Sequence, residues 1–169
     1  FPRIQLIKRA FPDAKFVHIV RDGRAVANSY RNKVVSGNFN TAKEETNWVG
    51  SWPKEWQYIY SKMGKNPYAF TLFQWKFFVK EIQKELKTIN SKDFLEINYS
   101  DLVCNTTLIA KEILDFAGVD MDKSMNYFIK NMPGENKNKK WKESIQREEK
   151  DMIDEILFED EFKQLLDRN

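Results

Sequence analysis

The sequence predicts a single α/β domain with a short parallel sheet and a mostly helical C-terminal half. Two short runs, residues 16–20 and 94–97, have the length and apolar content of buried strands. Each run is followed by a helical pattern, and alternation of strands with helices is typical of parallel sheets. A chain of 169 residues with a hydrophobic fraction of 41% can build one core, so we expect one domain over residues 1–169.

Residues 11–31 form the first part of this pattern: a strand, a tight turn and a helix. The apolar run 16–20 fits a strand that is covered on both faces. Asp22 is a suitable N-cap for a helix that begins near Gly23. Arg21 is therefore expected at the carboxyl end of the strand, where open α/β sheets bind ligands.

The middle of the chain predicts a loop followed by two helices. Gly37 and Asn38 are expected to end the preceding helical region, and a polar loop follows to about Asn47. Pro53 is expected in the first turn of a helix, with Ser51 or Trp52 at the cap, and residues 64–67 interrupt the helical pattern. The long helix that follows has an apolar face formed by Trp75, Val79, Ile82, Leu86 and Ile89. Its opposite face is expected to carry Lys76, Lys80, Lys84 and Lys87.

The second strand leads into further helices. The first of them ends at Gly118, and its inward residues are expected to be Ile109, Ile113, Phe116 and Ala117. A short amphipathic turn follows, which contains Met125, Phe128, Ile129 and Met132. Residues 133–142 predict a polar loop, and an acidic and apolar helix over residues 152–166 closes the chain.

Charge and cysteine content limit the partners and the compartment. A net charge of +3 does not by itself indicate nucleic-acid binding, and a site for a small anion is enough to account for it. No run of 18 apolar residues occurs, so we expect no transmembrane segment. Cys104 is the single cysteine and His18 the single histidine, which predicts no zinc cluster of such ligands, no disulfide and a cytoplasmic protein.

The turn after the first strand gathers groups that suit a phosphorylated ligand. Arg21 and Arg24 offer planar sets of donors, and the start of the helix offers free backbone N–H groups. Ser29 lies about two turns into the same helix. The alternative is that Asp22 and Arg24 form a surface ion pair and that Ser29 only faces solvent. The spacing alone leaves both interpretations open.

Residues 11–31, with an arginine at position 21 and a serine at position 29, resemble the second nucleotide-binding segment of the sulfotransferases. These enzymes transfer a sulfuryl group from 3′-phosphoadenosine 5′-phosphosulfate (PAPS) to a hydroxyl or amine acceptor. The resemblance implies that Arg21 and Ser29 hold the 3′-phosphate of the donor. It also implies a three-layer, P-loop-like fold.

A second stretch, residues 95–103 with the helix that follows it, resembles the tyrosine segment of the same family. The resemblance implies that Tyr99 contacts the adenine. A tyrosine has a flat apolar face and a hydroxyl, and both suit a purine. A core tyrosine that closes the strand is the alternative.

A third stretch, residues 137–143, resembles the C-terminal loop of the family, in which basic residues before a tryptophan close over the nucleotide. The Arg-Lys-Gly triplet of the family does not occur, and residues 134–136 stand where it is expected. We therefore assign no role to Lys139, Lys140 or Trp141.

Three other groups of residues are expected to be structural. His18 lies within the predicted strand, where a side chain points into a packed layer rather than toward an acceptor. Trp48, Trp52, Trp56 and Trp75 are expected in the core. Cys104 is expected to be a small buried hydrophobe, since no neighbouring base would activate it.

The sequence contains neither the 5′-phosphosulfate loop of the family nor its upstream base. We therefore expect the C-terminal portion of a sulfotransferase, a fragment whose sheet lacks its first strand, and we assign no catalytic residue and no metal. Two strands alone would leave an open apolar edge. The alternatives are a non-catalytic nucleotide-binding or interaction module of the same fold, or a nucleotide kinase relative. The acceptor and the oligomeric state are not readable from the sequence.

Overall fold

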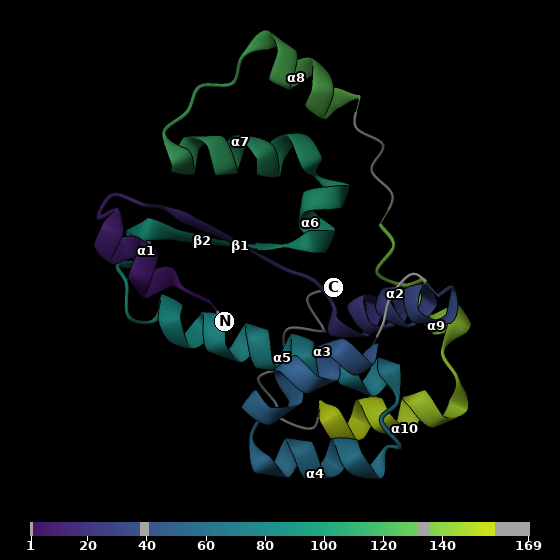
Figure 1. Cartoon of the computed structure of the whole chain (residues 1–169). Coiled ribbons are helices and arrows are strands. Elements are labelled where there is room, and N and C mark those ends of the chain that lie inside the picture. Colours follow the sequence, from purple (N-terminus) through teal and green to yellow (C-terminus); the bar gives the residue numbers. More distant parts are fainter. Residues whose placement is uncertain (1, 38–40, 132–135, 158–169) are drawn as a thin grey trace. The chain divides into compact units, whose positions relative to one another are not determined.

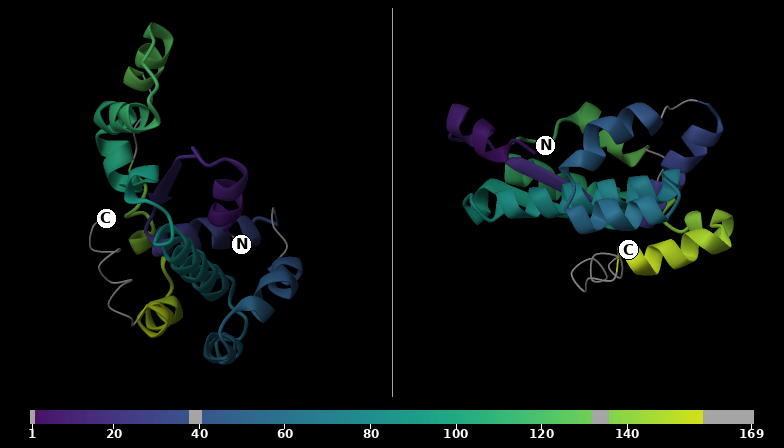
Figure 2. Two further views of the ribbon diagram at one scale, coloured as in Figure 1. Left: turned by 90° about the vertical axis from the view of Figure 1, so that its left-hand side faces the viewer. Right: turned by 60° about the horizontal axis from the view of Figure 1, so that its bottom comes forward.

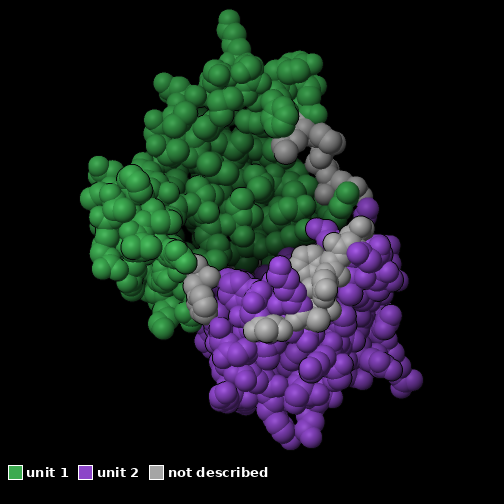
Figure 3. All heavy atoms as spheres, viewed as in Figure 1, with its two compact units in different colours: residues 1–21, 81–137, 169 green, residues 22–80, 138–168 purple. Residues whose placement is uncertain are grey.

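The computed structural model describes residues 2–37, 41–131 and 136–157. These residues form a mixed α/β structure that is mostly helical and contains a two-stranded parallel sheet (Figure 1). The α/β class predicted from the sequence is therefore confirmed. The described residues divide into two compact units (Figure 3). Unit 1 comprises residues 2–21, 81–131 and 136–137, and unit 2 comprises residues 22–37, 41–80 and 138–157.

The sheet belongs to unit 1 and pairs β1 (Phe16–Val20) with β2 (Phe94–Asn98) in parallel. Both strands occur where the sequence predicts them. Val20 lies opposite Asn98 at the end of the register, so the two strands finish at the same edge. Val17 and Ile19 of β1 are 40% and 46% exposed. The prediction that β1 is covered on both faces is therefore wrong, because an apolar run does not specify what packs on each face.

Three helices follow β2 in unit 1: α6 (Tyr99–Cys104), α7 (Thr106–Ala117) and α8 (Lys123–Lys130). Helix α7 contacts β2, α6 and α8, and its place beside α8 is visible from several directions (Figures 1 and 2). Gly118 ends α7 with a φ of 76°, a left-handed conformation that glycine adopts readily. Among the residues predicted to face inward from α7, Ile109, Ile113 and Phe116 are half-buried and Ala117 is exposed.

Helix α1 (Ile4–Ala10) opens unit 1 and was not predicted from the sequence. Its first backbone N–H, at Ile4, donates to Glu85 Oε2 at 2.6 Å. Lys8, near its end, pairs with Asp93 of the short 3₁₀ turn η2 (Ser91–Asp93) at 2.9 Å. Both partners are distant in sequence, which explains why no local pattern revealed this helix.

Unit 2 is helical throughout its described residues. It contains α2 (Gly23–Val35), α3 (Thr41–Trp48), η1 (Val49–Ser51), α4 (Lys54–Lys62), α9 (Trp141–Ser144), α10 (Arg147–Ile156) and residues 67–80 of α5 (Pro67–Leu86). Its core includes an aromatic cluster whose ring centroids lie 5.5 to 6.4 Å apart, formed by Trp52, Trp56, Tyr60, Phe70 and Phe73. The prediction that Trp52 and Trp56 belong to the core is confirmed.

Helix α3 is a correction, because the residues after Asn38 were expected to form a loop to about Asn47. Trp48 Nε1 donates to Glu44 Oε2 at 3.0 Å, one helical turn away. The neighbouring Glu45 accepts a hydrogen bond from the Tyr60 hydroxyl at 2.6 Å. The polar residues of this segment therefore make helical and tertiary contacts, which a polar composition does not reveal.

Lys76 was expected on the face of the long helix opposite its apolar side chains, and the structure buries it. It is 1% exposed, and its Nζ donates to the Ile156 carbonyl at 2.8 Å. The ammonium also lies 4.7 Å from the ring centroid of Trp56. A lysine in this position satisfies a carbonyl at the end of α10, where cations are favourable.

Several predicted boundaries also change. Helix α4 is capped by Pro53 rather than by Ser51 or Trp52. The closing helix α10 begins at Arg147, and the remainder of the predicted helix beyond residue 157 lies outside the described residues. Asn38 and residues 132–135 lie outside them as well. Among the residues that the structure does describe, no helix has the length and apolar character needed to cross a bilayer.

Candidate functional site

Arg21 and Tyr99 meet at the carboxyl edge of the sheet in unit 1. Arg21 directly follows β1, and Tyr99 directly follows β2 as the first residue of α6. The guanidinium carbon of Arg21 lies 4.5 Å from the centroid of the Tyr99 ring. The structure therefore brings together two of the three residues that the resemblance assigned to the nucleotide.

Local structure explains why both residues occupy this edge. Because Val20 and Asn98 are paired in the parallel register, the next residue of each strand leaves the sheet at the same level. Asn98 then caps α6, its side chain accepting from the Ser100 backbone N–H at 2.7 Å. This cap starts the helix at Tyr99 and places its ring beside Arg21.

The pair combines two recognition groups. A guanidinium over an aromatic ring is held by an attraction of about 0.5–2 kcal/mol, depending on exposure. A guanidinium also carries planar donors that match the geometry of phosphate oxygens. Arg21 and Tyr99 are both half-buried, and they lie where ligands bind to open parallel sheets.

Ser29, the third predicted residue, lies on α2 in unit 2 and is exposed. Asp22 caps this helix, accepting from the Arg24 backbone N–H at 2.8 Å, as the sequence predicted. Because Ser29 belongs to a different unit from Arg21 and Tyr99, its role in the same site stays a prediction.

The ion pair between Asp22 and Arg24, which was the alternative interpretation of this turn, is present in unit 2. Arg24 Nη2 lies 2.8 Å from Asp22 Oδ2, and Arg24 Nε lies 3.0 Å from Asp22 Oδ1. Asp22 is 3% exposed, so the pair is not at the surface as that alternative supposed. The guanidinium of Arg24 also lies 4.6 Å from the ring centroid of Trp141.

The segment 137–143, which resembles the basic C-terminal loop, has a buried tryptophan and exposed lysines. Trp141 is 9% exposed and begins α9, which contacts α2. Lys139 and Lys140 are exposed. Residues 134 and 135, which stand where the family has part of its triplet, lie outside the described residues.

His18 and Cys104 lie in unit 1. His18 Nδ1 is 3.1 Å from Glu96 Oε2, directly across the strand pair, and the His18 side chain is 11% exposed. This cross-strand contact supports the structural role predicted for His18. Cys104 is exposed, so the prediction that it is buried is wrong. It is the last residue of the short helix α6, where one face remains open to solvent.

Arg31 and Glu149 were missed by the sequence interpretation. Arg31 of α2 donates to Glu149 of α10, and their side chains are 10% and 1% exposed. Arg31 also donates to Asn28 Oδ1 at 2.7 Å and to the Ser144 carbonyl at 3.1 Å. Because the two ionised residues are separated by 118 positions, no local signal indicates their pairing.

Comparison with known proteins adds one match. The model of the sulfotransferase family matches residues 1–123, a range that contains Arg21, Ser29 and Tyr99. No curated protein and no solved structure matches the chain.

Proposed function

Because this chain belongs to the sulfotransferase family, we propose that it takes part in sulfuryl transfer from PAPS to a hydroxyl or amine acceptor. Arg21 and Ser29 bind the 3′-phosphate of the nucleotide in this proposal, and Tyr99 contacts its adenine. The proposal includes a single sulfotransferase-like domain over residues 1–169 with a three-layer, P-loop-like architecture.

The observation that carries the proposal is the contact between Arg21 and Tyr99. A nucleotide with a 3′-phosphate presents a doubly charged anion close to a flat purine. The guanidinium and the phenol ring match these two features, and their mutual contact fixes the spacing between them. Because the pair is already formed in the protein, little side-chain freedom is lost when the ligand binds.

The chemistry assigns a positioning role to these residues. In sulfuryl transfer the acceptor oxygen or nitrogen attacks sulfur, the bond from sulfur to the phosphate oxygen breaks, and adenosine 3′,5′-bisphosphate leaves. The acceptor loses its proton in the same process. In this proposal Arg21, Ser29 and Tyr99 bind the 3′-phosphate and the adenine, which are distant from the reacting sulfur atom. These residues therefore orient the donor rather than act on the transferred group. We assign no catalytic base.

The test compares two nucleotides of equal charge. Adenosine 3′,5′-bisphosphate and adenosine 2′,5′-bisphosphate differ only in the position of one phosphate. We expect the chain to bind the 3′,5′ isomer about tenfold more tightly, a difference of about 1.4 kcal/mol in binding free energy. Ser29→Ala should reduce this preference. Equal affinity for the two isomers would refute the assignment of a 3′-phosphate site.

A further inference from the structure

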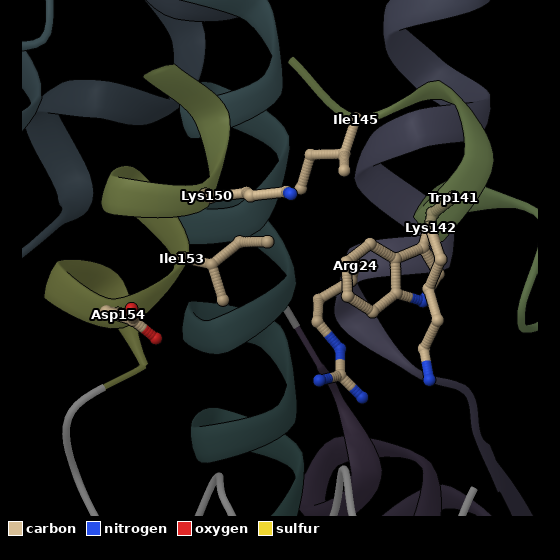
Figure 4. A pocket seen from close by; sticks show the side chains of 7 residues that line it. All are labelled: Arg24, Trp141, Lys142, Ile145, Lys150, Ile153 and Asp154. Atoms are coloured by element: carbon tan, nitrogen blue, oxygen red, sulfur yellow. The ribbon is translucent and has the colours of Figure 1, made fainter. Parts of the chain in front are cut away.

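Unit 2 contains a pocket that includes none of Arg21, Ser29 and Tyr99. Its volume is about 430 Å³, which lies in the range of small-molecule sites. Figure 4 shows its lining side chains, which come from α2, from α9 and the residue after it, and from α10.

Three cationic side chains line the pocket: Arg24, Lys142 and Lys150. Figure 4 shows the guanidinium of Arg24 and the amine of Lys142 at the same end of one wall, while Lys150 extends from α10 toward Ile145. The hydrogen bonds of Arg24 to Asp22 use Nε and Nη2. Within the described residues Nη1 of Arg24 is left for a ligand.

The two lysines add to this positive charge. Lys142 and Lys150 are exposed, and neither forms an ion pair within the part of the chain that the structure describes. Asp154 is the acidic residue of the lining. Asp22 is not part of the lining but pairs with Arg24, so the three cations are accompanied by two carboxylates. The cations still outnumber the acids, and the pocket favours an anion.

The remaining lining is apolar and partly fixed in place. Ile145 and Ile153 are half-buried, and the indole of Trp141 forms part of the wall. Arg24 is held on one side by a buried carboxylate and on the other by the Trp141 ring, so its orientation is set before a ligand arrives. A ligand that fits this lining has an anionic group and an apolar body.

We propose that this pocket binds a small organic anion, a carboxylate or sulfate group attached to an apolar or aromatic body. The volume is sufficient for a small molecule. The anionic group lies near Arg24 and Lys142, and the body lies against Ile145 and Ile153. The amine of Lys150, which extends toward Ile145, adds positive charge to the pocket.

The test uses 2-naphthyl sulfate as the probe and the whole chain as the receptor. 2-Naphthol has the same body without the charge, and inorganic sulfate has the charge without the body. Calorimetric titration should show that 2-naphthyl sulfate binds at least about tenfold more tightly than either control. Equal binding of 2-naphthol and 2-naphthyl sulfate would overturn the proposal, as would the absence of binding.

A pair of double variants locates the binding. Lys142→Gln with Lys150→Gln should weaken binding of 2-naphthyl sulfate about tenfold, since each exposed charge contributes about threefold. Lys54→Gln with Lys62→Gln removes two exposed lysines of α4 in the same unit and should leave the affinity unchanged. Equal losses in the two double variants would indicate non-specific attraction and would contradict the proposal.

A competition experiment separates this pocket from the proposed nucleotide site. Saturating adenosine 3′,5′-bisphosphate should leave the affinity for 2-naphthyl sulfate unchanged, and Arg21→Ala should do the same. Competitive displacement by the nucleotide would make the pocket part of the donor site and would overturn the proposal. If the chain fails to bind the nucleotide, the binding of 2-naphthyl sulfate remains as expected, so the two proposals fail independently.

Discussion

The guanidinium of Arg31 donates to the carboxylate of Glu149 in the interior of unit 2, across 118 positions of sequence. Glu149 Oε2 also accepts from the Gln146 backbone N–H at 2.9 Å, which completes the cap of α10. Asn28 links the same two segments, because its Oδ1 accepts from Arg31 and from the Ser144 hydroxyl. This network fastens residues 144–149 to α2, the helix that carries Ser29.

Removal of one partner of this pair is expected to be costly. Glu149→Gln leaves the buried guanidinium of Arg31 without a counter-charge, and we expect it to lower the free energy of unfolding by about 3 kcal/mol. Arg31→Met combined with Glu149→Met should destabilise the protein by less than the two single changes added together. Chemical denaturation of the unaltered chain, Arg31→Met, Glu149→Met and the double methionine variant gives the comparison, and Glu149→Gln is measured beside them. Additive losses would show that the two side chains are not coupled.

Gly23→Ala tests the packing at the start of α2. A Cβ atom at this position would lie 2.6 Å from two atoms of the Trp75 ring, which is 9% exposed and has little room to move. We expect a loss of about 1–3 kcal/mol in unfolding free energy. Gly50→Ala is the matched control, because a Cβ there meets nothing within 4 Å. A loss as small as that of the control would contradict the close packing of Gly23 against Trp75.

The stability of the chain should fall at alkaline pH. Burial, followed by the charges of Glu44 and Glu45, raises the pKa of Tyr30 from its ordinary value of 10.0 to about 12. The unfolded chain loses this proton near pH 10 while the folded chain keeps it, so the contribution of Tyr30 is complete below about pH 10 and is lost as the pH rises toward 12. Thermal unfolding between pH 9 and pH 12 measures this loss in the unaltered chain and in Tyr30→Phe. The two proteins should have about the same stability at pH 9, and Tyr30→Phe should lose less of it as the pH rises. If Tyr30→Phe declines as steeply as the unaltered chain, Tyr30 does not contribute.

Tyr99 is expected to act through its ring rather than its hydroxyl. Tyr99→Phe keeps the aromatic face beside Arg21 and should bind adenosine 3′,5′-bisphosphate within about threefold of the unaltered chain. Tyr99→Leu removes that face and should weaken binding about tenfold. Tyr127→Leu, at a tyrosine that is 73% exposed in the same unit, is the control. Equal affinities of the leucine and phenylalanine variants would argue that the ring does not contact the adenine.

The parts of the fold that the sequence predicted correctly depend on local chemistry. Asp22 caps α2 because a short carboxylate reaches the backbone N–H two residues ahead, and Gly118 ends α7 because it adopts a positive φ. The run 16–20 forms β1 as expected from its β-branched residues. Such features need no information about the rest of the chain.

The parts that the sequence did not predict depend on distant partners. Lys76 has the spacing of a solvent-facing residue, and only the carbonyl of Ile156, 80 positions away, explains its burial. The segment 41–48 has a polar composition that is typical of a loop. Its helix is stabilised by the Glu44–Trp48 contact and by the hydrogen bond from Tyr60, which the composition does not reveal. Helical periodicity describes which residues share a face, but it does not say what covers that face.

The candidate site shows the same division. Arg21 and Tyr99 could be placed at the ends of two strands from the sequence, and parallel pairing then makes them neighbours. Ser29 could be placed on its helix, but not relative to the other two residues. The pocket around Trp141 was not predicted, since its lysines come from segments far from Arg24 in sequence.

Arg21 and the 3′-phosphate provide the most direct test of the proposed nucleotide site. The unaltered chain and Arg21→Ala are titrated with adenosine 3′,5′-bisphosphate and with adenosine 5′-monophosphate, and Arg9→Ala, an exposed arginine of unit 1, is the control. The unaltered chain and the control should bind the bisphosphate at least about tenfold more tightly than the monophosphate, and Arg21→Ala should bind the two about equally. A preference for the bisphosphate that survives in Arg21→Ala would contradict the account.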